Sequence, residues 1–248
     1  MDIQGTCIAS TTDEHGPIYV YQTKNSRVLS FDGKIYQSCM KLNNINGLNL
    51  GYTQAMIMGL IFTPHLKTAT IMGLGAGSLA KTLLKHFTDL TLHAIEYRAA
   101  VATFAKQYFE LPETHRLTIH IDDAVNYIKS TKTKSDIIFS DLYSAEGMET
   151  KQIQAAYLQH CKAALNEQGV LVLNICHTES QLKQEFDVLL ARVFNNQLHR
   201  FTIEGGNTIV FAFKNTIPNI TQEALLTRVT SLQEKINVPV GRYAKLLI

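Results

Sequence analysis

Alternating glycines form the first motif of the sequence with chemical meaning. Gly73, Gly75 and Gly77 lie in the segment TATIMGLGAGSLAKTLLKHF, between an apolar stretch typical of a buried strand and a helical pattern that begins near Ser78. Glycine can take positive φ and lets the backbone approach a ligand closely. Such a turn can hold a nucleoside or a phosphate, but a GxGxG pattern also occurs in ordinary strand-to-helix turns, so it does not by itself define a site.

Carboxylates end the next two expected strands. Glu96 closes one of them, where a carboxylate can accept hydrogen bonds from both hydroxyls of a ribose; a surface glutamate is the alternative. Asp122 and Asp123 follow the other strand. One of the two could accept a hydrogen bond from an adenine amino group while the other caps a helix starting at Ala124; for Asp122, capping or exposure to solvent is an equally good interpretation.

Asp141 is a sharper candidate for chemistry. It ends the segment DIIFSD. The residues between the two aspartates are apolar apart from one serine. A carboxylate that a buried strand places in a crevice is more often functional than not, because burial perturbs the pKa of such a group. Parallel strands end at one edge of a sheet, so Asp141 is expected beside the glycine turn and the other acids.

The elements that must position these residues alternate between strand and helix. Such a series predicts a doubly wound, mostly parallel sheet. The buried strands are expected at Thr68–Gly73, Leu90–Glu96, Leu117–Asp122, Asp136–Asp141 and Val170–Cys176.

Two further strands are expected near the end of the chain. They cover Leu198–Glu204 and Thr208–Phe213, joined by a tight turn at Gly205-Gly206-Asn207. A hairpin at the end of a parallel sheet favours a Rossmann-like class I methyltransferase fold over a dehydrogenase. The predicted fold is therefore α/β, with a mostly parallel seven-stranded sheet and a C-terminal antiparallel hairpin; the helical spacing over Gln222–Ile236 adds a helix on the outside.

The first fifty residues have a different pattern. Residues 17–23 and 27–40 alternate apolar and polar side chains, and Asp32-Gly33 is a strong hairpin signal. A helix-like run extends from Tyr52 to Phe62. We therefore expect a small N-terminal β-strand region over 1–50 and a nucleoside-binding catalytic domain over 51–248.

The composition indicates which classes of partner the protein can bind. The 248 residues are 46% hydrophobic and carry a net charge of +2 without long like-charge blocks, so we expect a small-molecule partner and neither nucleic acid nor membrane. No apolar stretch approaches the roughly 20 residues of a membrane helix. The four cysteines show no CxxC pair, which indicates a reducing cytoplasm, and the nine histidines show no HExxH spacing, so no metal site is expected.

Taken in order, these motifs resemble those of the spermidine synthase (polyamine aminopropyltransferase) family over Arg27–Lys214. The resemblance is carried by FDGKIYQS with Gln37, YTQAM from Tyr52, the glycine turn, AIEYRAAV, IDDAVNYI and SDIIFSDLYSAEGM. It implies that decarboxylated S-adenosylmethionine, or S-adenosylmethionine itself, binds the glycine turn as co-substrate, with its ribose on Glu96 and its adenine on Asp123. It also implies that Asp141 helps to deprotonate a small amine acceptor, and that the chain forms a homodimer.

Three positions depart from the family's pattern. Ala76 stands in the glycine turn where the family has an acid, Ser144 follows Asp141 where the family has an aspartate, and Gln54 replaces the acid of the tyrosine-containing motif. Tyr52, Gln54, Tyr143 and Ser144 are expected in the acceptor pocket, with Gln37 on the donor side; core packing is the alternative for Tyr143. Cys176 and His177 could face the crevice, although a buried thiol and a capping imidazole are the simpler interpretation.

The departures bear on the acceptor. An alkyl amine with a pKa of about 10.4 is protonated at pH 7, and freeing its lone pair costs roughly 4 to 5 kcal/mol, which the site must supply. A carboxylate such as Asp141 can take the proton, while further acids orient a long dication. Fewer acids predict a shorter or less charged acceptor.

Three functions therefore remain open. The first is an aminopropyl transfer of the kind used in polyamine biosynthesis. The second is a small-molecule methyltransferase, since with Ala76 in the turn the helix end near Ser78 could tolerate the carboxylate of intact S-adenosylmethionine. The third is a catalytically silent nucleoside-binding protein. A nicotinamide dehydrogenase is disfavoured, because Ser78 stands where its glycine pattern needs Gly or Ala.

Overall fold

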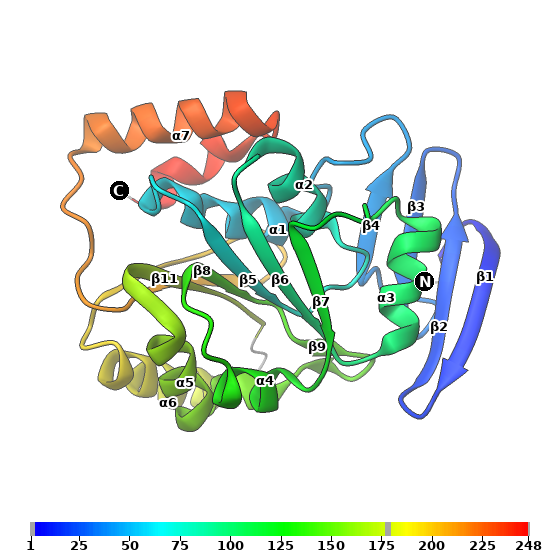
Figure 1. Ribbon diagram of the computed structural model, residues 1–248, viewed down its shortest axis with the longest axis horizontal. Helices are drawn as coiled ribbons and strands as arrows, with labels where there is room; N and C mark the ends of the chain where they lie inside the picture. Colours follow the sequence, from blue (N-terminus) through cyan, green and yellow to red (C-terminus); the bar gives the residue numbers. More distant parts are fainter. Residues whose placement is uncertain (1–2, 177–179, 248) are drawn as a thin grey trace.

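The computed structural model describes residues 3–176 and 180–247, with side chains described throughout except at 180–183. A seven-stranded sheet lies at its centre (Figure 1). The strand order is β12-β13-β11-β8-β5-β6-β7. The strands are β5 (Thr68–Met72), β6 (Thr91–Glu96), β7 (Leu117–Ile121), β8 (Ser135–Ser140), β11 (Leu165–Ile175), β12 (Leu198–Thr202) and β13 (Thr208–Phe213).

Five neighbouring strands of the sheet run parallel to one another: β7, β6, β5, β8 and β11. Strands β12 and β13 form an antiparallel hairpin beside β11. The predicted α/β fold with a C-terminal hairpin is confirmed. The chain crosses from β5 to β6 and β7 on one side and later to β8 and β11 on the other. A crevice is expected where this order reverses, outside the carboxyl ends of β5 and β8.

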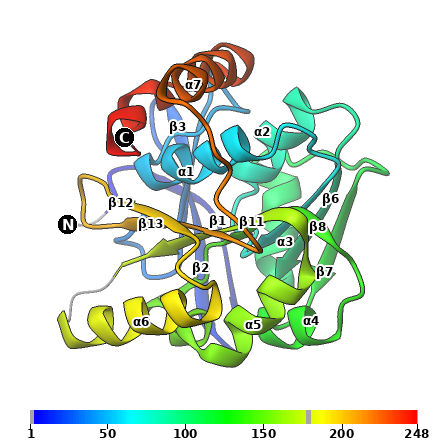
Figure 2. The same cartoon turned by 90° about the vertical axis from the view of Figure 1, so that its left-hand side faces the viewer.

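Helices cover both faces of the sheet (Figures 1 and 2). One face carries α4 (Ala124–Ser130), α5 (Ala155–Ala164) and α6 (Ser180–Val193). The other carries α1 (Gly51–Met56), the 3-10 helix η1 (Ile57–Phe62), α2 (Ser78–His86), α7 (Gln222–Ile236) and the 3-10 helix η3 (Val240–Leu246). Each face has its own cluster of buried apolar side chains. The helix predicted over Gln222–Ile236 is confirmed.

The helix predicted from Tyr52 to Phe62 changes type halfway, from α1 to η1. Every residue of η1 is buried. At Gly59 a Cβ atom would come within 2.6 Å of the Val172 side chain and 2.9 Å of that of Ile137, both on the central sheet. Glycine at this position therefore lets the helix backbone lie directly on the sheet.

The N-terminal residues form a separate four-stranded antiparallel sheet. Its strands, in spatial order, are β1 (Thr6–Asp13), β2 (Gly16–Gln22), β3 (Ser26–Ser30) and β4 (Ser38–Lys41). Helix α3 (Ala99–Tyr108) lies between this sheet and β6 (Figure 1). Apolar residues of the small sheet and of α3 share one buried cluster, which fixes the small sheet against the edge of the central one.

The hairpin predicted around Asp32-Gly33 is confirmed, and its connection is longer than a two-residue turn. Strands β3 and β4 do pair, with Leu29 opposite Ser38, but the connection between them runs over residues 31–37. The Asp32 carboxylate accepts hydrogen bonds from the backbone N–H groups of Lys34 and Ile35 and folds a local turn inside that connection. The aspartate's side chain competes for backbone donors, so the connection is a loop and not a two-residue turn.

Within the described residues, no helix combines the length and the apolar character that crossing a bilayer requires.

Candidate active site

A cavity of about 590 Å³ lies at the carboxyl ends of the parallel strands. Residues of the central sheet, the N-terminal sheet, α1 and the segment after Asp141 line it. The structure brings together ten of the predicted site residues in this lining: Gln37, Tyr52, Gly73, Gly75, Glu96, Asp122, Asp123, Asp141, Tyr143 and Ser144. Gly77 and Gln54 are not in the lining.

The glycine turn forms one wall of the cavity. Gly73 and Gly75 have φ values of +92° and +53°. A Cβ atom at Gly73 would collide with the carbonyl oxygen of Asp141, and one at Gly75 would lie 2.8 Å from Ser38 Oγ. The absence of side chains here lets the ends of β5 and β8 meet and leaves the turn's backbone open to the cavity.

Gly77 has a structural role and is not in the cavity lining, so its contact with a ligand stays a prediction. It is the N-cap of α2, with φ +74°. A Cβ atom at Gly77 would come within 2.7 Å of the Leu111 side chain, on the side of the turn that packs into the core. The sequence pattern does not distinguish the glycines that face a ligand from one that serves helix packing.

Glu96 is buried at the end of β6, with 8% of its surface exposed. Its Oε2 accepts a hydrogen bond from Gly75 N at 3.1 Å, and its Oε1 accepts one from Arg98 N at 3.0 Å. Burial raises the pKa of this carboxyl group, and the backbone N–H groups oppose that rise. Each carboxylate oxygen has a second lone pair, so Glu96 can hold the glycine turn and still accept from two ligand hydroxyls.

Asp123, not Asp122, caps α4. Its Oδ1 accepts hydrogen bonds from Val125 N at 2.8 Å and Asn126 N at 3.3 Å, and its Oδ2 pairs with Lys151 Nζ at 2.9 Å. Burial alone would raise the pKa of Asp123, but the Lys151 and backbone hydrogen bonds lower it overall. Asp122 is exposed and accepts from Asp123 N. The structure thus settles which of the two carboxylates is the cap, which the sequence left open.

Asp141 follows β8 directly, and its backbone N donates to Met72 O of β5. Its Oδ1 accepts a hydrogen bond from Asn174 Nδ2 at 2.8 Å. Burial raises the pKa of Asp141 to about 6, although the Asn174 hydrogen bond opposes the rise. A carboxylate with a pKa near 6 is ionised at neutral pH and can accept a proton, as a general base must.

Tyr52 and Tyr143 face Asp141 from α1 and from β9 (Tyr143–Ser144). Burial, followed by the negative charge of Asp141, raises the pKa of both phenols, so they stay neutral near pH 7. Tyr52 donates to Gln37 O at 3.2 Å, and Gln37 Nε2 donates to Ser144 O at 3.3 Å. These bonds connect α1, the N-terminal sheet and the segment after Asp141.

Gln54 lies behind this wall and is not in the cavity lining, so its role in binding the acceptor stays a prediction that the structure does not support. Its Nε2 donates to Leu48 O at 2.6 Å, and its Oε1 accepts from Arg242 of η3 at 2.6 Å. Both polar ends of the amide are therefore used inside the protein. Successive helix residues point in different directions, so Tyr52 can face the cavity while Gln54 cannot.

Sequence reasoning missed several lining residues: His15, Ser38, Tyr97, Arg98, Lys151, Asn174 and Asn207. Asn174 had a signal, since it is a polar residue inside the apolar run VLVLN. Nothing in the sequence pointed to the others, because they come from loops and from a separate sheet. Cys176 does line the cavity, whereas His177 lies outside the described residues.

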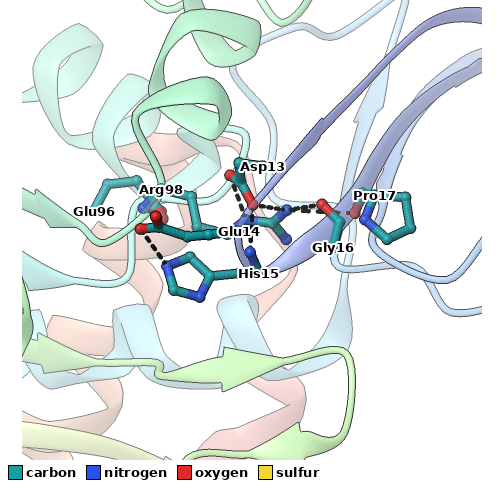
Figure 3. A network of polar contacts seen from close by, with 7 residues as sticks. All are labelled: Asp13, Glu14, His15, Gly16, Pro17, Glu96 and Arg98. Carbon is teal, nitrogen blue, oxygen red and sulfur yellow. Dashed lines mark hydrogen bonds and ion pairs between the residues drawn. The ribbon is translucent and has the colours of Figure 1, made fainter.

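Arg98 ties the N-terminal sheet to the cavity (Figure 3). Its guanidinium makes two hydrogen bonds to the Asp13 carboxylate, at 2.7 and 3.0 Å, and one to Gly16 O at 2.6 Å. It also lies 4.8 Å from the centre of the Phe31 ring. Its own backbone N–H holds Glu96, so the same residue supports the buried glutamate and the turn between β1 and β2.

Asp13→Asn is expected to lower the free energy of unfolding by about 2 kcal/mol at pH 7, because the guanidinium keeps its burial but loses its counter-charge. The hydrogen bond from Arg98 holds the pKa of Asp13 below its usual value. The stabilisation is therefore present above about pH 4 and lost as pH falls through the lowered pKa. Urea denaturation of both proteins at several pH values measures this.

A matched control for Asp13 is Glu113→Gln, which removes the exposed ion pair with Lys106. It is expected to leave the free energy of unfolding unchanged at every pH. Equal effects of the two substitutions would show that the Asp13–Arg98 contact is only a surface ion pair.

Comparison with known proteins identifies the family. The spermine/spermidine synthase domain matches residues 50–216. The polyamine aminopropyltransferase of Vibrio vulnificus is 27% identical over 238 residues, covering 92% of this chain and 78% of that protein. The crystal structure of a probable spermidine synthase from Corynebacterium glutamicum has a TM-score of 0.77 at 19% identity, covering 89% of this chain and 86% of that one.

A second kind of protein is also similar. The crystal structure of human methyltransferase-like protein 13 in complex with SAH has a TM-score of 0.68 at 25% identity, and covers 77% of this chain and 94% of that one. The fold alone therefore does not separate the two activities. The domain match spans well over half of the chain, so this chain belongs to the spermine/spermidine synthase family.

Proposed function

We propose that the protein is a transferase that moves an aminopropyl group from decarboxylated S-adenosylmethionine to a small amine, as in polyamine biosynthesis. One observation carries the proposal: the Asp141 carboxylate, whose pKa desolvation raises to about 6, lines the same cavity as the open glycine turn and the buried Glu96. This places a group able to take a proton beside a site suited to a ribose. Membership of the spermine/spermidine synthase family supports the same function.

The donor is expected to lie along the carboxyl edge of the sheet. Its ribose hydroxyls donate to Glu96, whose position is fixed by Gly75 and Arg98. Its adenine lies near Asp122 and Asp123, where the amino group can donate to a carboxylate; the lone pairs of Asp123 are shared with the helix cap and Lys151. The sulfonium then lies past the open backbone of Gly73 and Gly75, towards Asp141.

The reaction in this arrangement is an in-line displacement at carbon. The acceptor arrives as an ammonium ion and gives one proton to Asp141, which frees its lone pair. The nitrogen attacks the carbon of the aminopropyl group that is bonded to sulfur. The C–N bond forms as the C–S bond breaks, and the electrons of the C–S bond move to sulfur. Methylthioadenosine leaves as a neutral thioether. The product is again an ammonium ion, and Asp141 releases its proton to solvent. Holding both reactants in one cavity supplies much of the rate.

The charges around Asp141 restrict the acceptor. The neighbouring polar groups Tyr52, Tyr143 and Asn174 are neutral, and Ser144 donates to Glu146, which is exposed. On this side of the described cavity lining, Asp141 is the carboxylate whose pKa is raised by burial. A short amine that presents one ammonium group to Asp141 fits this wall better than a long amine that needs a second buried carboxylate.

Methyl transfer from intact S-adenosylmethionine is the second candidate function. The buried Ala76 in the glycine turn supports it, because no acid stands there to repel a carboxylate. The similarity to methyltransferase-like protein 13 supports it as well.

Isothermal titration calorimetry with the two donors separates these functions. We expect decarboxylated S-adenosylmethionine to bind at least about tenfold more tightly than the intact donor, a difference of about 1.4 kcal/mol, because the intact donor must bury its extra carboxylate. Mass spectrometry should detect methylthioadenosine only with the decarboxylated donor and an amine. Preference for the intact donor would favour methyl transfer, and no binding of either would overturn both functions.

A further inference from the structure

Two asparagines form a hydrogen-bonded chain behind Asp141. Asn174, near the end of β11, is 1% exposed, and its Nδ2 donates to Asp141 Oδ1 at 2.8 Å. Its Oδ1 accepts from Asn207 Nδ2 at 2.9 Å. Asn207 belongs to the turn between β12 and β13, so three elements distant in sequence meet at this chain. All three residues line the cavity.

Asn207 fixes which way the Asn174 amide points. A side-chain amide presents two donors at one end and an acceptor at the other. With the amino group of Asn207 on one side, the oxygen of Asn174 must face it, and the amino group of Asn174 must face Asp141. The opposite orientation would place two oxygens together at Asp141 and two amino groups together at Asn207. In a buried site both contacts are costly.

The hairpin backbone holds Asn207 in place. Ile203 N donates to Asn207 O at 2.9 Å, and Gly206 N donates to Ile203 O at 3.1 Å. Gly205 and Gly206 supply the positive φ values, +98° and +91°, that the turn needs. The Tyr143 phenol donates to the backbone oxygen of Asn174 at 3.4 Å. The antiparallel hairpin thus returns a polar side chain to the carboxyl end of β11.

We propose that Asn174 and Asn207 are positioning residues for the reaction: Asn207 orients the Asn174 amide, which binds Oδ1 of Asp141 and turns Oδ2 towards the acceptor amine. Among the described residues, none donates a hydrogen bond to Oδ2. This inference rests on the proposed function for its catalytic meaning, whereas the orientation of Asp141 can be tested without turnover.

The hydrogen bonds from Asn207 to Asn174 and from Asn174 to Asp141 also affect the charge state of Asp141. A hydrogen bond to the ionised carboxylate favours that form and opposes the effect of burial on the pKa. The titratable groups facing Asp141 are the phenols of Tyr52 and Tyr143, with Cys176 beside Tyr143. Both phenols have a raised pKa, so they remain neutral while Asp141 titrates. A change in the titration of Asp141 on altering Asn207 therefore reports on the asparagine chain.

The test is a carbon-13 NMR titration of the Asp141 carboxyl group, assigned by its disappearance in Asp141→Asn. The wild-type midpoint is expected near 6. Asn207→Ala should raise it by about half a unit, because the Asn174 amide loses its fixed orientation. Asn207→Asp is nearly isosteric but turns the donor into an acceptor, so the Asn174 amide should reverse and the midpoint should rise by about one unit or more.

Thr208→Val is the matched control, because it removes the exposed hydrogen bond between Thr202 and Thr208 in the same hairpin without reaching Asp141. It should leave the midpoint unchanged. Equal midpoints in wild type and both Asn207 variants would overturn the proposal, as would an equal rise in Thr208→Val. The melting temperature of each variant shows whether it is folded.

Turnover with decarboxylated S-adenosylmethionine is a separate measurement, made with a short monoamine and, in parallel, with 1,4-diaminobutane as acceptor. In the Asn207 variants, kcat should fall at least tenfold, the KM for the donor should stay unchanged, and the acidic limb of the pH profile should move in parallel with the NMR midpoint. If the NMR midpoint moves while kcat and the pH profile stay constant, Asn174 and Asn207 are not positioning residues for the reaction. Absence of turnover in wild type would count against the proposed function, while the NMR titration would still decide the orientation of Asp141.

Discussion

Asp141→Asn is expected to lower kcat by about a hundredfold to ten-thousandfold, because it removes the cavity carboxylate that is placed to take a proton from the acceptor. Donor affinity should stay unchanged, since the donor's ribose and base are held elsewhere, at Glu96 and near Asp123. Steady-state kinetics measure the first effect, and calorimetry with methylthioadenosine measures the second. Retained turnover would remove Asp141 from the chemistry.

The wild-type pH profile follows from the same group. Asp141 must be ionised to accept a proton, so turnover should rise with pH through about 6. Burial raises the pKa of Asp141 in the folded protein above its value in the unfolded protein. The ionised carboxylate therefore destabilises the protein at pH values above the folded-state pKa. At pH values below the unfolded-state pKa the group is protonated in both states and has no such effect. Asp141→Asn should therefore raise the free energy of unfolding at pH 8 by about 3 kcal/mol, and not at pH 4.

Asp136→Asn is the matched control, since Asp136 lies at the opposite end of the same strand, β8. Its carboxylate accepts from Lys67 N, Thr68 N and Asn166 Nδ2, away from the cavity. This substitution should lower stability and leave kcat unchanged. Loss of turnover in both variants would mean that the effect of Asp141→Asn is structural.

Glu96→Ala is expected to abolish the rise in melting temperature that methylthioadenosine gives to the wild type. Two hydrogen bonds from ribose hydroxyls to the buried Glu96 carboxyl group contribute about 3 kcal/mol or more, which is about a hundredfold in Kd. The substitution also frees Gly75 N and Arg98 N, so the glycine turn loses its support. Thermal unfolding with and without the nucleoside measures the effect.

Two comparison variants make the Glu96 experiment specific. Glu96→Gln keeps an acceptor oxygen and should retain part of the melting shift, whereas the exposed Glu113→Gln should retain all of it. An undiminished shift in Glu96→Ala would contradict the placement of the ribose.

The sequence predicts the central sheet well because strand patterns alternate with helical patterns, most clearly at the apolar runs of β8 and β11. The five predicted strands end within one residue of β5, β6, β7, β8 and β11. The connection after β3 was less predictable, since the Asp32 side chain rather than the backbone decides its shape. The strand β1 carries mostly exposed side chains, so its sequence has no clear apolar pattern.

The candidate site was predictable only where strand ends define it. Glu96, Asp123 and Asp141 follow strands, and the topology brings all such ends to one edge. Gly77 and Gln54 lie outside the cavity lining, which spacing along the sequence could not foresee because it does not say which side of a turn or helix meets the cavity. Arg98 and Asn207 were missed because their partners, Asp13 and Asn174, are distant in the sequence.

The crystal structure of the protein with methylthioadenosine is the most direct test of a shared donor and acceptor cavity. We expect ribose hydroxyls within hydrogen-bond distance of Glu96, adenine beside Asp122 and Asp123, and the thioether sulfur turned towards Asp141. A nucleoside bound outside this cavity, or bound in it with sulfur pointing away from Asp141, would contradict the account.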